Sequence, residues 1–167
     1  MTQWFSGEEV YKIDTKGRVS IPADFRAVLV DGDLDGADPR TPSLMIHYGP
    51  AAKDRRLECY TMQAFKEVTD KLKKMPRGSP RRRALEGYFH GQSQRMTVDE
   101  TGRLVLPQKL REMIGLEREV CFVAAADTFN IWKPEDYEQE KATRQAEIED
   151  LVGEGVDPLS LLEEEGI

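Results

Sequence analysis

Three basic side chains surround one short turn sequence near the N-terminus. Lys12, Lys16 and Arg18 lie in or beside the segment that runs from Asp14 to Arg18, and Arg26 follows eight residues later. A two-stranded ribbon fits the major groove of duplex DNA, where arginine can bond guanine O6 and N7 or a phosphate. We therefore favour nucleic-acid contact for Lys12, Lys16 and Arg18. The alternative for Arg18 is an exposed ion pair with Asp14 that only stabilises the turn, worth at most about 1 kcal/mol.

The same pattern occurs again 85 residues further along the chain. Residues 11–26 align with residues 96–111 without a gap, and four apolar positions match in register. The identical pairs are Asp14 and Asp99, Gly17 and Gly102, Arg18 and Arg103, Pro22 and Pro107, and Arg26 and Arg111. The match resumes at an offset of 72, so the first copy carries 13 extra residues, which we place in surface loops within 31–43 and 49–56. The chain therefore contains an internal repeat.

In both copies the pattern Asp-x-x-Gly-Arg is typical of a turn between two strands. Gly17 and Gly102 can supply the positive φ that such a turn needs, and each aspartate can accept a hydrogen bond from the backbone two residues on. We therefore assign a structural role to Asp14, Gly17, Asp99 and Gly102.

The two turns differ in charge. The residues that stand in the second copy in place of Lys12, Thr15 and Lys16 are Thr97, Glu100 and Thr101. Arg103 therefore lies beside a carboxylate. We hypothesise that the first turn is the one that binds DNA. The second turn mainly completes the barrel and its contacts, and Arg103 is its candidate DNA-binding residue. For Arg26 and Arg111, a DNA contact and an ion pair on a helix surface are equally open.

Each copy is expected to be mostly β structure. A strand ends at Ile13 or Val98, the turn follows, a second strand returns, and a short helix opens with Pro22 or Pro107. The remaining strands are expected at 19–21, 104–106, 44–48, 57–60, 119–124 and 128–132. A copy of about 50 residues is marginal on its own because it buries too little surface. We therefore expect an α+β fold, mostly β, in which interleaved hairpins of both copies form a pseudo-two-fold swapped-hairpin β-barrel.

The sequence divides into four parts: a first repeat at 8–63, a helical linker at 64–92, a second repeat at 93–136 and a tail at 137–167. In the linker, apolar residues at three- and four-residue spacing predict one helix over 62–75 and a second that opens at Ser79 and Pro80, with both apolar stripes in the core. The tail should begin as a helix and continue as an acidic, partly ordered segment.

A second basic cluster surrounds the turn between the two linker helices. Its members are Lys71, Lys73, Lys74, Arg77, Arg81, Arg82 and Arg83. Three arginines in the first turn of a helix oppose the helix dipole and need a compensating partner. The acidic face of a neighbouring subunit, the acidic tail and phosphate would all serve, and a plain solvated face is the alternative.

The net charge of -7 at pH 7 is unevenly distributed along the chain. Residues 1–132 carry 21 basic and 19 acidic side chains, whereas residues 133–167 carry 3 and 12. The acidity therefore belongs mostly to the tail, and it does not argue against DNA binding by the rest of the chain.

The sequence lacks the residue patterns that enzymes and metal sites use. It has no Gly-rich phosphate loop, no nucleophile elbow and no metal-spaced histidine pair, so we predict no enzymatic activity, no metal and no cofactor. His47 and His90 stand alone, and Cys59 and Cys121 are expected to be buried thiols in a reducing cytoplasm. The longest apolar run, 120–126, is far shorter than the roughly 18 residues of a spanning helix, so no membrane partner is expected.

The doubled pattern Asp-x-x-Gly-Arg-hydrophobic-x-hydrophobic-Pro-x-x-[Phe/Leu]-Arg resembles the MraZ family of bacterial transcriptional regulators. The resemblance spans about residues 6–137, and it includes Phe5-Ser-Gly-Glu8 and Ile131-Trp132. The two repeats of that family are similar to AbrB-like (SpoVT-AbrB) swapped-hairpin domains.

The resemblance implies a cytoplasmic, nucleoid-associated DNA-binding protein that forms a ring and binds short direct repeats upstream of its own cell-division and cell-wall operon. The family's Asp-x-x-x-Arg motif falls on Asp14 and Arg18, and again on Asp99 and Arg103. Related AbrB-like domains also use basic residues at the positions of Lys12 and Arg26. The alternative function is that of a protein-interaction or antitoxin-like module that uses the barrel and the tail.

Overall fold

The computed structural model describes residues 4–49, 51–153, 155 and 157–164. The chain forms two compact units, Met1–Pro134 and Glu135–Ile167. No helix in the described part of the chain combines the length and the apolar character that crossing a membrane requires.

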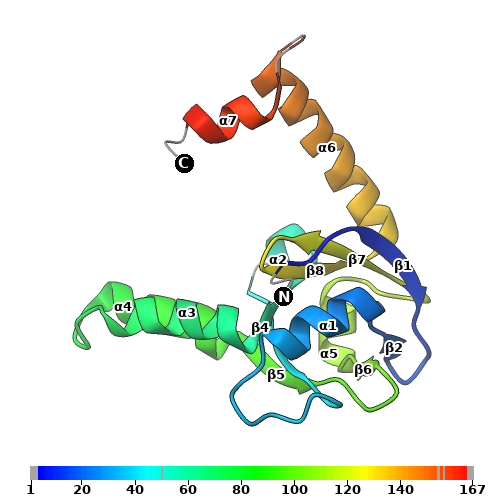
Figure 1. Ribbon diagram of the computed structural model, residues 1–167, viewed down its shortest axis with the longest axis vertical. Coiled ribbons are helices and arrows are strands. Elements are labelled where there is room, and N and C mark those ends of the chain that lie inside the picture. The colour runs from blue at the N-terminus through cyan, green and yellow to red at the C-terminus, as the bar shows by residue number, and fades with distance from the viewer. Residues whose placement is uncertain (1–3, 50, 154, 156, 165–167) are drawn as a thin grey trace. The chain divides into compact units, whose positions relative to one another are not determined.

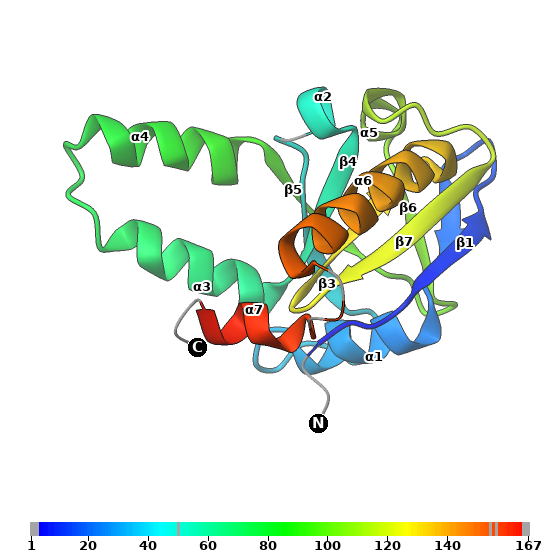
Figure 2. The same ribbon diagram turned by 90° about the horizontal axis from the view of Figure 1, so that it is seen from above.

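A six-stranded antiparallel sheet organises the larger unit, in the order β1-β7-β8-β4-β3-β5. Its strands are β1 (Glu8–Lys12), β3 (Ser43–His47), β4 (Arg56–Thr61), β5 (Ser93–Thr97), β7 (Glu119–Ala125) and β8 (Thr128–Trp132). A separate two-stranded ribbon pairs β2 (Arg18–Ser20) with β6 (Arg103–Val105). Figures 1 and 2 show the ribbon beside the larger sheet.

The two copies of the repeat are related by a pseudo-two-fold axis. If every strand is replaced by its counterpart, β1 by β5, β3 by β7 and β4 by β8, the sheet order becomes its own reverse. The pairs β1–β7, β3–β5, β4–β8 and β2–β6 each join one copy to the other. Four of the six strand pairings therefore join the two copies, as expected for two units that are too small to fold alone.

The predicted closed barrel is wrong. Among the described strands, β1 pairs only with β7 and β5 only with β3, so the six-stranded sheet stays open. The core is covered by the ribbon and by two short helices, α1 (Ala23–Asp31) and α5 (Gln108–Met113), instead of by further curling of the sheet. Phe25 and Leu110 from these helices and Val19 and Leu104 from the ribbon are almost fully buried in it.

Short helices follow the ribbon strands, as the prolines predict. Pro22 and Pro107 lie at the N-cap, one position earlier than expected. The insertion that precedes β4 contains a further short helix, α2 (Ala51–Asp54).

The linker forms a helical arm that projects from the sheet (Figures 1 and 2). It consists of α3 (Met62–Lys73), α4 (Pro80–Glu86) and the π-helical turn η1 (Gly87–Gly91). The side chains of Thr61 and Ser79 cap α3 and α4 by accepting hydrogen bonds from backbone N–H groups. The apolar stripe of α3 is buried in part, at Ala64, Phe65 and Leu72, but these residues lie outside the core cluster of the sheet.

The smaller unit is helical. It contains most of α6 (Pro134–Val152) and all of α7 (Leu159–Glu164). The predicted helical start at Pro134 is thus confirmed, and the helix continues for 19 residues through the acidic segment.

Candidate nucleic-acid interface

The β2–β6 ribbon places Arg18 and Arg103 on one exposed face. Arg18 pairs with Val105 and Ser20 with Arg103, whereas Val19 and Leu104 form the central pair. Because side chains alternate along a strand, the outer four residues point away from the core while Val19 and Leu104 point into it. The two arginines are therefore diagonal neighbours on a single surface, and Val105, 48% exposed, lies beside Arg18.

Asp14 holds the turn that precedes β2. Its carboxylate accepts hydrogen bonds from the backbone N–H groups of Lys16 and Arg18, each at 2.9 Å, and from Arg18 Nε at 2.6 Å. The bonds from the backbone and side chain of Arg18 lower the pKa of Asp14 below its ordinary value, so the group stays ionised near neutral pH. The contact of Asp14 with the guanidinium of Arg18 is made through Nε, and 42% of the Arg18 side chain is exposed.

The second turn repeats this geometry with one change. Asp99 Oδ1 accepts from the backbone N–H groups of Thr101 and Arg103, each at 2.9 Å, and from the Thr101 hydroxyl at 2.7 Å. The Thr101 hydroxyl bond and the Arg103 backbone bond lower the pKa of Asp99. Arg103 Nε donates to Thr101 Oγ1 at 3.0 Å, while Asp99 Oδ2 lies 3.6 Å away. Each aspartate thus accepts hydrogen bonds from backbone groups of its own turn.

Gly17 and Gly102 adopt φ of +87° and +82°, the left-handed region that the turn sequence predicts. Each is also packed against the other copy. A β-carbon at Gly17 would collide with the backbone carbonyl oxygen of Leu106, and a β-carbon at Gly102 would collide with the guanidinium of Arg26. Both positions therefore favour glycine for conformation, and Gly17 also for space, because its obstacle is a backbone atom.

Arg26 and Arg111 lie against the turns of the opposite copy and are half-buried. Arg111 donates from Nε to Leu106 O at 3.0 Å and from Nη1 to Thr15 O at 3.4 Å. Arg26 packs its guanidinium over Gly102, and its buried Nε has no hydrogen-bond partner among the described residues. This geometry gives both arginines contacts within the fold, whichever further role they have.

Lys12 and Lys16 are exposed beside the first turn. Lys12 is the last residue of β1 and lies opposite Glu119 in β7. The first turn therefore carries more positive charge than the second, as the sequence predicts.

Sequence reasoning missed two contributors to this surface. Arg40, from the insertion in the first copy, reaches across to the second turn and places Nη1 4.0 Å from Glu100. It also pairs with Asp38 at 2.9 Å. Val105 was detectable from the strand alternation around Leu104, but no local signal indicates that a loop from one copy brings Arg40 to the turn of the other.

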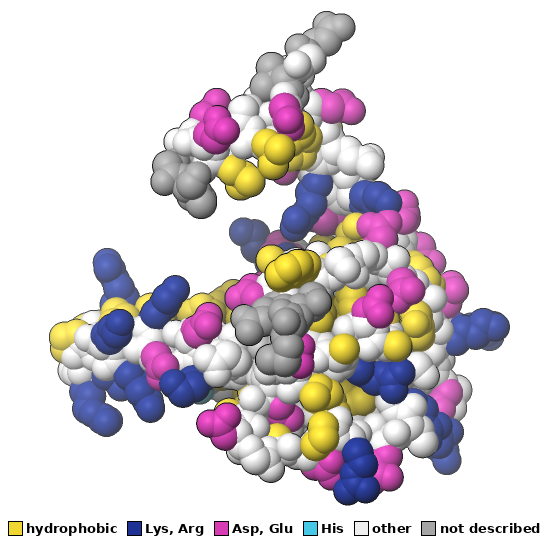
Figure 3. Space-filling view, viewed as in Figure 1, with side chains coloured by type: hydrophobic (Ala, Val, Ile, Leu, Met, Phe, Trp, Pro, Cys, Tyr) yellow, Lys and Arg dark blue, Asp and Glu magenta, His cyan; other side chains and the backbone are white. Residues whose placement is uncertain are grey.

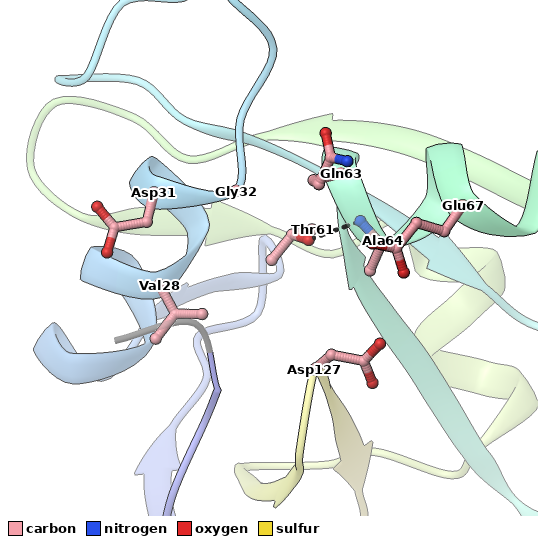
Figure 4. Close-up of a pocket in the computed structure, with 8 residues that line it drawn as sticks. All are labelled: Val28, Asp31, Gly32, Thr61, Gln63, Ala64, Glu67 and Asp127. Carbon is pink, nitrogen blue, oxygen red and sulfur yellow. Dashed lines mark hydrogen bonds between the residues drawn. The ribbon is translucent and has the colours of Figure 1, made fainter. Parts of the chain in front are cut away.

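One cavity among the described residues lies beside the start of α3. The cavity in Figure 4 has a volume of about 120 Å³ and is lined in part by Asp31, Thr61, Glu67 and Asp127. The Thr61 hydroxyl there caps α3 by accepting from Ala64 N at 3.0 Å. No cluster of His, Cys, Asp and Glu among the described residues could hold a metal ion.

Both cysteines are buried free thiols, as predicted. Burial raises the pKa of Cys59 well above its ordinary value, which disfavours the reactive thiolate.

Comparison with known proteins matches both halves of the chain to one family. The family described as "MraZ protein, putative antitoxin-like" matches residues 4–87 and 89–152. A protein of Ruegeria sp. (strain TM1040) is 48% identical over 166 residues, which are 99% of this chain and 99% of that relative. The chain belongs to the MraZ family. The resemblance inferred from the doubled turn is thus confirmed.

Other MraZ relatives support the same assignment. A protein of Ruegeria pomeroyi is 49% identical over 99% of both chains, and one of Cereibacter sphaeroides (strain ATCC 17029 / ATH 2.4.9) is 37% identical over the full length of both. All three relatives carry the name "Transcriptional regulator MraZ". None of these names describes an enzyme, which agrees with the prediction that the chain is not one. The family match extends through residue 152 and so includes all of α6.

Proposed function

We propose that the chain is a sequence-specific DNA-binding transcription regulator that uses the outer face of the β2–β6 ribbon. The observation that carries the proposal is the placement of Arg18 and Arg103 on one exposed face, each with Nε held by a neighbouring oxygen. The name carried by its MraZ relatives supports regulation of transcription.

The dimensions of the ribbon suit a DNA groove. Two strands of three residues span roughly 10 Å along their length and lie about 5 Å apart, and the major groove of B-DNA is about 12 Å wide. An arginine that is fixed through Nε can direct its terminal nitrogens to guanine O6 and N7 or to a phosphate. Lys12 and Lys16 then add phosphate contacts on the side of the first turn, whereas the positions of Thr15 and Lys16 are occupied by Glu100 and Thr101 in the second turn.

Within this proposal the remaining site residues have different tasks. Asp14 and Asp99 orient the arginines, and Gly17 and Gly102 permit the turns. Arg26 acts through the turn that it packs against, because its guanidinium lies over Gly102.

The proposal includes several ribbons acting together in a ring of identical subunits. One ribbon offers few phosphate contacts, and such non-specific binding commonly has a Kd of about 10⁻⁴ to 10⁻⁶ M. Ribbons that are linked and meet short direct repeats in DNA gain effective concentration, often about a hundredfold or more. The repeats upstream of the chain's own cell-division and cell-wall operon are the proposed target, and the nucleoid in the cytoplasm is the proposed location.

The experiment measures binding of the full chain to its own upstream DNA by fluorescence anisotropy across a series of salt concentrations. Arg18→Ala should weaken binding by roughly tenfold or more for each ribbon that contacts a base, and the loss of each phosphate contact should reduce the salt slope by about one. Arg144→Ala is the matched control, because Arg144 also pairs through Nε with a carboxylate four residues away, at 2.8 Å, but lies in α6.

Two outcomes would refute parts of the proposal. If the wild type shows no preference for its own upstream DNA at moderate salt, it is not a sequence-specific regulator. If Arg103→Ala weakens binding as much as Arg18→Ala in folded protein, the first turn is not the dominant reader.

An antitoxin-like module is the second candidate, favoured by the description of the family and by the acidic tail. In that case deletion of residues 138–167 should abolish the function in cells, while Arg18→Ala should leave it intact. The opposite pattern supports the regulator.

A further inference from the structure

The helical arm carries an uncovered apolar groove. The groove has a volume of about 250 Å³ and lies between α3 and the segment formed by α4 and η1. Its lining residues are Val68, Lys71, Leu72, Met75, Leu85 and Phe89. Of these, only Leu72 is buried, and none belongs to the core of the sheet. Apolar surface that a single chain leaves open in this way is typical of an interaction site.

Positive charge surrounds the groove. Residues 62–91 contain eight Lys and Arg against three Asp and Glu, and Figure 3 shows basic side chains along both edges of the arm. Arg82 is the exception among the clustered cations, because it is buried and donates to Met75 O at 2.6 Å at the end of α3. The other arginines and lysines of the cluster point to solvent.

The apolar groove and the basic residues around it together indicate which kind of partner binds to the arm. A second arm would bring two basic surfaces together, so like-charge repulsion opposes it. Phosphates of DNA would match the charge but would leave the apolar floor uncovered. An acidic segment with exposed leucines matches both the floor and the rim.

The C-terminal segment of the chain has this composition. Residues 145–167 contain eight acidic and no basic side chains. In α7, Leu159 and Leu162 are 65% and 55% exposed and lie three residues apart, so they occupy one face of the helix, followed directly by Glu163 and Glu164.

Along the chain, the tail and the arm start from opposite ends of β4. The larger unit ends just after Trp132, which lies opposite Arg56 at the start of β4. The arm leaves from the other end of β4, after Thr61. The tail therefore begins about 17 Å from the root of its own arm, on the far end of a strand of six residues.

We propose that α7 of one copy binds in the basic-rimmed groove of the arm of another copy. Leu159 and Leu162 enter the groove, and the carboxylates of Glu163 and Glu164 face the lysines and arginines at its rim. The contact links chains through surfaces other than the ribbon, so it leaves the ribbon free for DNA.

The experiment uses the full chain with a photoreactive benzoylphenylalanine at Leu162. Chains of natural isotope composition are mixed with ¹⁵N-labelled chains, irradiated and digested, and cross-linked peptides are identified by mass spectrometry. We expect cross-links from position 162 to peptides within 66–89 that join heavy to light chains. Lys71→Glu should reduce their yield by roughly three- to tenfold, because it reverses a rim charge. Lys53→Glu, a charge reversal at an exposed site in α2, is the control and should have no effect.

A second readout does not depend on the photoreactive residue. If α7 covers the groove, replacing Leu159 and Leu162 by serine should raise the acetylation rate of Lys71 several-fold, while Leu34→Ser should not. Cross-links confined to single chains, or directed outside 66–89, would overturn the proposal. So would protection of Lys71 by duplex DNA together with no response to the serine substitutions, a result that would assign the arm to DNA.

Discussion

Substitution of the two turn glycines by alanine should have unequal costs, although the residues are equivalent in the repeat. Both have φ above +80°, where a β-carbon costs about 1–2 kcal/mol. At Gly17 the new methyl group also collides with the carbonyl oxygen of Leu106. The backbone N–H of the same Leu106 donates a hydrogen bond to Gly17 O at 2.8 Å. The backbone cannot move away from the methyl group without breaking that hydrogen bond. This adds about 1–3 kcal/mol to the cost of the substitution. Gly17→Ala should therefore destabilise the fold by about 3–4 kcal/mol.

At Gly102 the obstacle is the end of a flexible side chain. The added methyl group meets the guanidinium of Arg26, which can move away, so Gly102→Ala should cost only about 1–2 kcal/mol beyond small repacking losses. Removing that side chain by Arg26→Ala should make the Gly102 substitution cheaper still. By contrast, Arg111→Ala should not rescue Gly17→Ala, because the Leu106 carbonyl remains in place.

Urea unfolding followed through the fluorescence of buried Trp132 measures these differences. With a slope of about 1–3 kcal/mol per molar urea, Gly17→Ala should lower the midpoint by more than 1 M. Equal losses at both glycines, or full rescue of Gly17→Ala by Arg111→Ala, would refute the assignment of the Leu106 carbonyl as the rigid obstacle.

Two further predictions concern buried polar groups. Arg82→Met should destabilise the arm by about 1–3 kcal/mol, because Met75 O loses its charged hydrogen-bond donor. The loss should be measurable as faster amide hydrogen exchange in α3. The control is Arg83→Met, at an exposed neighbouring position, which should not accelerate exchange. Burial lowers the pKa of His47 from 6.5, so the unfolded chain takes up this proton first and stability should fall as the pH drops below 6.5. Urea midpoints at pH 7.5 and 5.5 measure the effect. An unchanged pH dependence in His47→Gln would contradict its assignment to His47.

Local sequence was sufficient for the parts of this protein that depend on near neighbours. The spacing of Asp14, Gly17 and Arg18 predicted the turn, because the hydrogen bonds of Asp14 reach only two and four residues along the chain. Repetition at 85 residues predicted the second turn and the two-fold relation of the strands, since two similar sequences form similar local structure. Both linker helices were likewise evident from apolar spacing, and the second also from its cap at Ser79.

Tertiary structure decided how these elements meet. Pairing of β2 with β6 brings Arg18 and Arg103, which are 85 residues apart, onto one surface. The paired strands also cover the core, while the six-stranded sheet remains open. The same docking sets Arg26 over Gly102 and Arg40 beside Glu100. Strand pairing depends on the apolar surface that the whole core buries. Every element contributes to that surface, so no short segment of sequence is enough to predict the pairing. The sequence by itself therefore determined the two turns and their basic residues, and only the folded chain determined which of these residues share a face.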